Sequence, residues 1–374
     1  MAGIYFHIPF CKQACYYCDF HFSTSSRHRS QMLQAMHHEL ALQANYLSQP
    51  VETIYFGGGT PSLLAADDLQ RLVDSAASHF DILPGAEITI EANPDDLDDA
   101  KVRALRGTAV NRFSIGIQSF FEEDLRWMNR AHDAAEAHGA IQRVLDAGYV
   151  AITADLIYGY PLLSDDKWQY NVNRLLDFAI PHVSAYSMTV EPQTALAAFV
   201  RKGIQAPMDE TQSAAQFEYL MDTLIAKGYV HYEISNFAKP GCYARHNSGY
   251  WKGTPYLGIG PSAHSFDGDT RQWNVRNNAR YIAKVTAGVL PCEKEVLSEQ
   301  DRLNEYIMTA LRTIWGVDLD HVAKQFGHAH CQMLRSALQP FLLSGDLFLS
   351  GKIATLTRRG KLFADHIAAE LFVS

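Results

Sequence analysis

Residues 4–20 have the sequence IYFHIPFCKQACYYCDF, an apolar run followed at once by three closely spaced cysteines. The run 4–8 is rich in Ile, Tyr and Phe, a composition that favours a buried β-strand. Cys11, Cys15 and Cys18 then follow in a C-x3-C-x2-C pattern. We therefore expect the chain to open with a strand whose carboxyl end carries a group of thiols.

Apolar runs of this kind alternate with helical stretches through the first 190 residues, and the alternation predicts an α/β fold with a parallel sheet. Six repeats are too few for a closed eight-fold barrel, so we expect an open, partial (β/α)6 barrel, with a doubly wound sheet as the alternative. In both folds ligands gather at the carboxyl ends of the strands. The predicted strands are 4–8, 53–56, 87–91, 112–117, 152–158 and 182–188, and the predicted helices are 31–46, 67–80, 135–147 and 165–178.

The pattern changes beyond Pro192, where the sequence predicts an accessory α+β region. Its predicted elements are a helix at 208–227, a strand at 229–235, a Gly, Pro, Asn and aromatic-rich segment at 241–268, helices at 299–313, 319–325 and 331–343, strands at 347–350 and 353–356, and a final helix from Thr357. Helices followed by a small hairpin are typical of a winged-helix-like module. We therefore expect a barrel domain at 1–190, a connecting region at 191–295 and a C-terminal domain at 296–374.

Composition narrows the class of protein. With 374 residues, the chain buries roughly three quarters of its unfolded surface and needs no covalent staple to fold. Its six cysteines are too sparse for the disulfide framework of a small secreted protein. The net charge of -9 argues against a nucleic-acid binder. Neither a long apolar run nor a basic leader is present, so we expect a cytoplasmic protein without a transmembrane segment.

The cysteine triplet has three interpretations. Thiolates are soft ligands, and three of them can hold three irons of a [4Fe-4S] cluster while the fourth iron stays open. Zinc held by the triplet and His21 is an alternative, as are three free thiols. A position at the mouth of a large α/β core favours a reactive cofactor. Cys242, Cys292 and Cys331 fall in no motif, and we expect them to be ordinary reduced residues.

Five motifs together resemble the radical S-adenosylmethionine (SAM) superfamily. They are HIPFCKQACYYCDF at 7–20, GGGTPS at 57–62, EANP at 91–94, GIQSF at 116–120 and DLIYGYP at 155–161. The resemblance covers essentially the whole chain. It is closest to the branch of the oxygen-independent coproporphyrinogen III oxidases and, within that branch, to a family of heme chaperones. It implies a [4Fe-4S] cluster on Cys11, Cys15 and Cys18, with SAM and heme as further ligands.

The same resemblance implies a SAM site. The glycine loop would bind the SAM amino group, Glu91 would accept hydrogen bonds from the ribose, and Arg130 would pair with the SAM carboxylate. The full set is Tyr5, Tyr17, Gly58, Gly59, Thr60, Glu91, Gln118, Arg130 and Asp155. Read without the family, the glycines form a tight turn, Glu91 is a charge at a helix start, and Arg130 is half of a surface ion pair. In the superfamily the reduced cluster gives one electron to SAM and a 5'-deoxyadenosyl radical results.

A second motif, RHNSGYW at 245–251, resembles the HNxxYW motif of the heme chaperones. Imidazole is a common axial ligand of heme iron, and Tyr and Trp offer flat apolar surface to a porphyrin. His246 is therefore the predicted heme-site residue, although a lone loop histidine is more often solvated or hydrogen-bonded. His7, His21 and His264 remain further candidates; the last lies in a segment similar to a SAM-facing loop of the oxidase.

Two departures from the oxidase bear on function. Phe20 stands where the oxidase has a fourth cysteine, and the first cluster cysteine comes at residue 11 without a long preceding extension. Both features match the heme chaperones. We therefore expect a chaperone that passes heme to an unidentified acceptor protein, with a homodimer implied by the family. An oxygen-independent coproporphyrinogen III oxidase, or another radical SAM enzyme acting on a tetrapyrrole, is the alternative, and a zinc-stapled structural protein is a third hypothesis.

Overall fold

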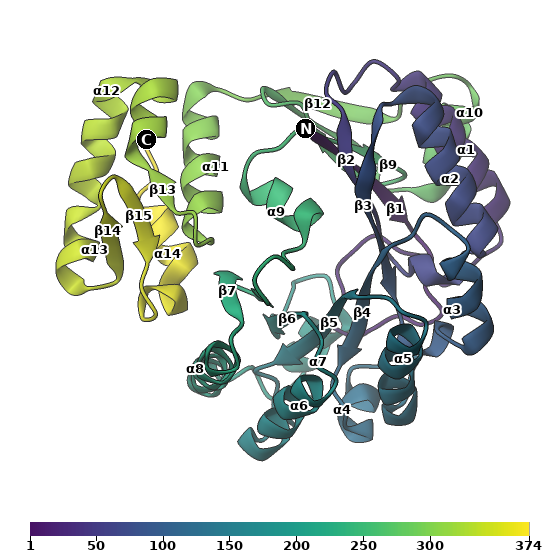
Figure 1. The fold of residues 1–374 in the computed structure, drawn as a ribbon, viewed down its shortest axis with the longest axis horizontal. Helices are drawn as coiled ribbons and strands as arrows, with labels where there is room; N and C mark the ends of the chain where they lie inside the picture. The colour runs from purple at the N-terminus through teal and green to yellow at the C-terminus, as the bar shows by residue number, and fades with distance from the viewer. Residues whose placement is uncertain (374) are drawn as a thin grey trace.

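The computed structural model describes residues 1–373, which contain a 12-stranded sheet and a separate three-stranded sheet (Figure 1). The large sheet has the order β12-β11-β10-β9-β1-β2-β3-β4-β5-β6-β8-β7. Strands β1 to β6 are mutually parallel and adjacent in chain order. This is the order of an open barrel, and the doubly wound alternative is wrong because its strand order reverses. The six strands, all predicted, are β1 (Ala2–Ile8), β2 (Val51–Gly58), β3 (Ile82–Ala92), β4 (Arg112–Gln118), β5 (Ala151–Tyr158) and β6 (His182–Ser187).

Helices of the barrel half cover the outer side of this sheet (Figure 1). They are α1 (Arg29–Leu42), α2 (Ala66–His79), α3 (Asp99–Arg106), α4 (Glu122–Trp127), α5 (Ala134–Asp146) and α6 (Asp165–Asp177), with short 3-10 turns η1 (Pro61–Leu63) and η2 (Pro94–Asp96). The four predicted helices are present, and α3 and α4 were not predicted. Helix α1 ends at Leu42 rather than at residue 46, because the next residues form a turn.

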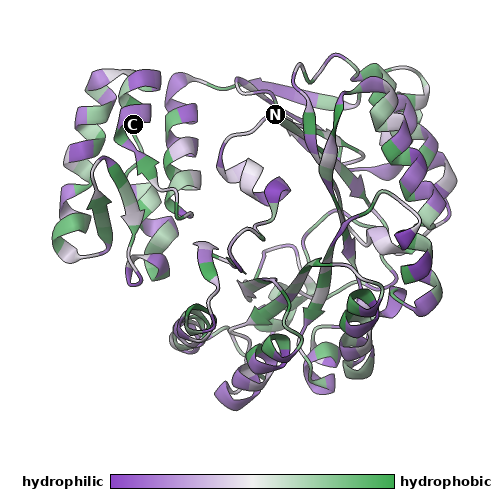
Figure 2. Cartoon of the chain, viewed as in Figure 1, coloured by the Kyte–Doolittle hydropathy of each residue, from purple (hydrophilic) through white to green (hydrophobic). Residues whose placement is uncertain are grey.

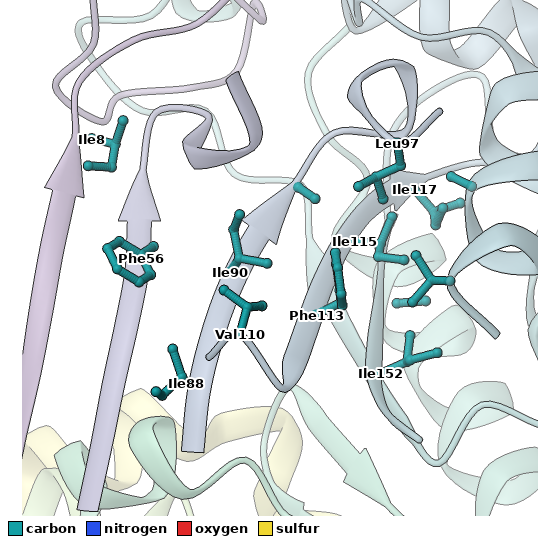
Figure 3. Packing of buried hydrophobic residues seen from close by; sticks show 14 of the residues in the cluster. Ile8, Phe56, Ile88, Ile90, Leu97, Val110, Phe113, Ile115, Ile117 and Ile152 are labelled. Atoms are coloured by element: carbon teal, nitrogen blue, oxygen red, sulfur yellow. The ribbon is translucent and has the colours of Figure 1, made fainter. Parts of the chain in front are cut away.

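Side chains along the parallel strands point alternately to the face covered by helices and to the concave face of the sheet. Ile88 and Ile90 on β3, and Ile115 and Ile117 on β4, are buried in one apolar cluster with residues of the covering helices (Figure 3). Successive side chains of a strand point to opposite faces. The intervening positions therefore face the concave side, where they carry Tyr55, Glu91, Ser114 and Asp155. Figure 2 shows the same division, with hydrophobic strands at the centre and mixed helices outside.

The segment expected to be a connecting region supplies strands to both ends of the large sheet. Strand β9 pairs in parallel with β1, and β8 pairs antiparallel with β6. Short helix α9 lies on the concave side, in contact with β1 and β2 (Figure 1). The elements are α7 (Ala195–Arg201), α8 (Glu210–Ala226), β7 (Val230–Glu233), β8 (Asn236–Ala238), α9 (Arg245–Trp251), β9 (Tyr256–Ile259), β10 (His264–Phe266), β11 (Thr270–Asn274), α10 (Asn278–Thr286) and β12 (Cys292–Val296).

The C-terminal part has its own apolar core. The predicted helices at 319–325 and 331–343 are present, but the second has different bounds. The span α12 consists of two helices that meet at a kink at Gly327 (φ 89°, ψ 161°), and the second of them ends at Ala337, after which Pro340 opens a new helix. The last helix begins after a 3-10 turn rather than at Thr357, whose hydroxyl donates to the carbonyl oxygen of Gly345 (2.8 Å). The elements are α11 (Glu299–Leu311), β13 (Val317–Asp318), α12 (Leu319–Ala337), α13 (Gln339–Ser344), β14 (Leu347–Ser350), β15 (Ile353–Leu356), η3 (Gly360–Phe363) and α14 (Ala364–Glu370).

The hairpin of β14 and β15 was predicted, whereas β13, the third strand of the small sheet, was not. The winged-helix-like character of this part stays a prediction. Among the described residues, no helix is both long and apolar enough to cross a membrane.

Candidate functional site

A cavity of about 470 Å³ opens at the carboxyl ends of strands β2 to β6. Most of the predicted site residues line it, and they come from strands β2 to β5, from the loops after β1 and β2, and from the segment between α4 and α5. They are Cys11, Cys15, Tyr17, Cys18, Gly58, Gly59, Thr60, Glu91, Gln118, Arg130 and Asp155. Tyr5 and His246 do not line this cavity. The fold thus gathers in one place side chains that are up to about 140 positions apart in the chain.

The cysteine loop is closed by its own backbone. The Cys11 amide donates to the carbonyl oxygen of Ser23 (3.1 Å), and the Ser23 amide donates to that of Pro9 (2.9 Å). All three thiols are free and partly buried. Burial raises the pKa of the Cys18 thiol to about 12 and also raises that of Cys11. Binding a metal would therefore have to displace protons from these thiols.

Two hydrogen-bond donors from other elements reach this loop. The Thr60 hydroxyl donates to Cys11 Sγ (3.4 Å), and Arg130 Nη1 lies 3.4 Å from Cys15 Sγ. Donors of this kind stabilise thiolates, so the environment suits metal-bound sulfur. The donor set of three soft sulfurs on one cavity fits a [4Fe-4S] cluster in which three irons each take one thiolate and the fourth iron is left open.

His21, the fourth ligand in the zinc interpretation, is engaged elsewhere. It lines a second cavity, and its Nε2 shares a hydrogen bond with Asn278 Oδ1 (2.7 Å). Within residues 1–373, no three His, Cys, Asp or Glu side chains are placed to bind one metal ion. The position of His21 therefore gives no support to a Cys3His site.

The glycine loop packs directly against the cysteine loop. Gly58 has φ 103°, a conformation that disfavours any side chain. A Cβ added to Gly59 would lie 2.7 Å from the carbonyl oxygens of Ile8 and Phe10. The Gly59 amide donates to Ile8 O (2.9 Å), so the two loops are joined by backbone. Glycine is required here because two backbones meet, which goes beyond the simple tight turn of the alternative interpretation.

Two half-buried carboxyl groups, on β3 and β5, face the cavity from either side of β4. Glu91 accepts hydrogen bonds from Tyr55 Oη (2.8 Å) and from the Gly58 amide (3.2 Å). Asp155 accepts one from Ser114 Oγ (3.2 Å). Burial raises the pKa of Glu91 to about 7 and that of Asp155 to about 6. Glu91 is held by its own strand neighbours rather than by the start of the following turn, and both groups can accept hydrogen bonds from ligand hydroxyls.

Arg130 supplies a positive charge to the same cavity. Its Nη2 donates to Asn93 Oδ1 (2.7 Å) and to Gly116 O (3.0 Å), and its Nη1 lies 3.4 Å from Tyr17 Oη. Arg130 makes no ion pair with any carboxylate among residues 1–373. The surface ion-pair interpretation is therefore wrong, and the guanidinium keeps its charge for a ligand.

Two buried polar atoms in this cavity lack a hydrogen-bond partner. They are Arg130 Nε and Gln118 Oε1, and Gln118 also has the unusual φ of 63°. Buried polar groups in folded proteins are nearly always paired. Because Arg130 and Gln118 both line the cavity, an unpaired donor and acceptor lie in its walls, which fits a polar ligand such as SAM.

His246 lies outside this cavity, in the interior of the barrel. Its Nδ1 shares a hydrogen bond with Thr53 Oγ1 (2.8 Å), and its Nε2 shares one with Tyr250 Oη (2.8 Å). The rings of Tyr55 and Tyr5 stack on it at 5.0 and 6.5 Å. Burial lowers its pKa to about 3, so the imidazole is neutral. Both nitrogens of the predicted heme-site histidine are thus already used within the protein.

Several residues that line the first cavity were not predicted. Tyr55 and Ser114 occupy inward positions of β2 and β4, and the period of two along each strand is the signal that identifies them. Asn93, which orients Arg130, lies inside the EANP motif. Asn247, next to His246, also lines the cavity, and only the placement of α9 against the sheet brings it there.

Comparison with known proteins shows which families this chain resembles in sequence. The family model of the Radical SAM superfamily matches residues 5–175, and that of the HemN C-terminal domain matches residues 297–363. The heme chaperone HemW of Mycobacterium tuberculosis is 36% identical over 99% of this chain and 94% of its own. Those of Bacillus subtilis and Escherichia coli are 31% and 30% identical, over 98% and 100% of this chain and 98% of each relative.

Among solved structures, the coproporphyrinogen III oxidase (HemN) of Escherichia coli, a radical SAM enzyme, superposes with a TM-score of 0.85. The match covers 100% of this chain and 90% of the other, at 24% identity. At that identity the likeness concerns the fold alone.

Proposed function

Because the chain belongs to the family of the HemW heme chaperones, we propose that it binds heme and passes it to an acceptor protein, with a [4Fe-4S] cluster and SAM as its cofactors. One observation carries the cofactor part of the proposal. A single cavity is lined by three thiols, a glycine loop, two carboxyl groups and the guanidinium of Arg130, which makes no ion pair with the described residues. Each of these groups matches a different part of a cluster with SAM bound to it.

In this proposal Cys11, Cys15 and Cys18 hold the cluster, and the carbonyl groups of the glycine loop accept hydrogen bonds from the SAM amino group. Arg130 pairs with the SAM carboxylate, and Glu91 accepts hydrogen bonds from the ribose hydroxyls. When both cofactors are bound, the reduced cluster supplies one electron to SAM. The remaining cavity residues, Tyr17, Gln118 and Asp155, orient the nucleoside and limit the access of water.

The cofactor part is tested by anaerobic reconstitution of the full chain, followed by iron analysis and EPR of the reduced protein with and without SAM. We expect about four iron atoms per chain and a signal that SAM alters. Cys11→Ser should lose most of the iron, whereas the control Cys242→Ser, outside the triplet, should keep it. Zinc in place of iron, or a signal that SAM leaves unchanged, would contradict the proposal.

The chaperone part is tested by titrating the cluster-loaded protein with hemin and then adding an apo-hemoprotein acceptor. We expect stoichiometric binding and transfer that is faster than from free hemin. Failure to bind hemin would refute this function.

A radical reaction on a tetrapyrrole is the second candidate, and it is favoured by the presence of every predicted SAM-facing side chain except Tyr5 in one cavity. Anaerobic incubation with SAM, a reductant and coproporphyrinogen III distinguishes the two functions. We expect no decarboxylated product, since Phe20 replaces the fourth cysteine of the oxidase motif. Robust turnover would make the chain an enzyme.

A further inference from the structure

A second cavity, of about 300 Å³, lies beside the first and shares Asp19 and Phe20 with it. Its other lining residues come from β1, α9, β9, β10 and the loops beside them, and they include Tyr5, His7, His21, Tyr250, Tyr256 and His264. Ligand pockets in proteins usually measure roughly 300–1,000 Å³. This cavity is therefore large enough to receive part of a planar ligand and to leave the rest exposed.

The three imidazoles of this cavity differ in what they can bind. His7 uses both nitrogens, through Tyr5 Oη (3.2 Å) and the His21 carbonyl (2.8 Å). His21 uses Nε2 for Asn278. His264 is exposed, and within residues 1–373 neither of its nitrogens makes a hydrogen bond. Its ring lies nearly parallel to Trp273, with centroids 6.2 Å apart and an angle of 29°.

The walls of the cavity suit a flat apolar ring with acidic edges. Phe20 is 67% exposed, and the Tyr250 and Tyr256 rings meet edge to face at 4.7 Å. Arg276 lines the cavity and donates only to the carbonyl oxygen of Asp19, with no ion pair among the described residues. Asp19 is the one carboxylate among the lining residues. An exposed apolar side chain beside an unpaired guanidinium matches a porphyrin face and a propionate.

We propose that this second cavity is the heme site, that His264 is the axial ligand of the iron and that Arg276 pairs with a propionate. The assignment rests on the proposed heme binding and specifies its place. It gives His246 a positioning role, because His246 holds the hydroxyl of Tyr250, whose ring lines the cavity. The HNxxYW motif then acts through its tyrosine, and its histidine does not contact the iron.

The test compares hemin with metal-free protoporphyrin IX on the full, cluster-loaded chain, using absorption difference spectra and EPR of the ferric heme. His264→Ala should weaken hemin binding at least tenfold and change the ligation spectrum, and it should leave protoporphyrin binding unchanged. Arg276→Ala should weaken both ligands by a similar factor, because both carry propionates. His264 is exposed, so its replacement should not unfold the protein.

His246→Ala separates positioning from ligation. It should weaken hemin and protoporphyrin alike and leave the ligation spectrum of bound heme as in the unmodified protein. Tyr250→Phe, which keeps the ring but loses the hydroxyl that His246 holds, should weaken both ligands to a similar extent and also leave the ligation spectrum unchanged. His79→Ala, an exposed histidine on α2, serves as the matched control and should change nothing.

Two results would overturn the assignment. One is an unchanged hemin affinity and spectrum in His264→Ala; the other is loss of histidine ligation in His246→Ala. Failure of the unmodified protein to bind hemin is a different outcome, because it refutes the proposed function itself.

Discussion

Two glutamates of this protein, Glu91 and Glu39, have different roles because their neighbours differ. Glu39 is fully buried and Glu91 is half-buried, and burial raises the pKa of each to about 7. Glu91 opens onto the first cavity, whereas Glu39 is enclosed by Tyr281, Asn274 and the Gly260 amide. The carboxyl group of Glu91 is therefore available to a ligand, whereas that of Glu39 connects α1 to the segments that carry its three partners.

At this scale, the pKa of Glu91 predicts that SAM affinity depends on pH. The carboxylate accepts hydrogen bonds from both ribose hydroxyls only when it is ionised, so affinity should fall as pH decreases below about 7. Glu91→Gln should bind SAM at least tenfold more weakly at pH 8 and show a flatter pH profile. Anaerobic calorimetry between pH 6 and 8 measures both effects. Identical profiles for the two proteins would show that Glu91 does not touch the ribose.

At the scale of elements, Glu39 connects α1 to the added edge of the sheet. Its carboxylate accepts hydrogen bonds from the Gly260 amide after β9 (2.8 Å) and from Asn274 on β11 (2.6 Å), and Tyr281 on α10 also donates to it. A helix expected from the barrel repeat is thereby attached to a region expected to be a connector. Short strands such as β9 to β12 give too little periodicity to be recognised from sequence.

Glu39 also predicts a pH-dependent stability. Its pKa in the folded state, about 7, exceeds the value of 4.5 that it has when exposed. Its contribution to stability is therefore full below pH 4.5 and is lost as pH rises through 7. Compared with Glu39→Gln, the unmodified protein should lose about 2 to 3 kcal/mol of unfolding free energy between pH 5 and pH 8.

Urea denaturation of both proteins at several pH values measures this difference. The exposed Glu370→Gln is the matched control and should show no such trend. A constant difference between Glu39→Gln and the unmodified protein across this range would contradict the assigned pKa direction.

At the scale of the whole molecule, the C-terminal core is attached to the large sheet near its last strand. The Ile234 amide donates to Arg312 O (3.0 Å), and the Ile314 amide donates to Tyr232 O (3.0 Å). Arg312 Nε also donates to the buried carboxylate of Glu233 (3.2 Å). Figure 1 shows the C-terminal part beside β7 and α9. An ion pair between the half-buried Arg312 and the buried Glu233 thus lies at the junction of the two cores.

This junction gives a prediction with an internal control. Arg312→Ala leaves Glu233 buried without its cation and should cost about 3 kcal/mol of unfolding free energy. Arg312 also pairs with Asp365 (2.8 Å), which is highly exposed, so Asp365→Ala should cost less than about 1 kcal/mol. Chemical denaturation of the three proteins measures both effects. Equal losses in the two variants would show that Glu233 does not need its cation.

The sequence by itself determined the repeat of the barrel and the cysteine triplet, and its motifs carry the resemblance that implies the residues proposed to hold SAM. These features are encoded in consecutive residues, because strand periodicity and ligand spacing are local properties. Even unpredicted residues such as Tyr55 and Ser114 follow from the alternation of side chains along their strands.

Only the tertiary structure decided where the histidines lie and what they contact. His246 is buried because α9 packs against β1 and β2, where Thr53, 193 positions away, shares a hydrogen bond with it. His264 reaches the second cavity because β9 pairs with β1. Such contacts depend on how distant segments pack, and no local pattern records their geometry. A motif can therefore indicate that a histidine matters, but burial and hydrogen bonding decide whether its nitrogens are free to bind a metal.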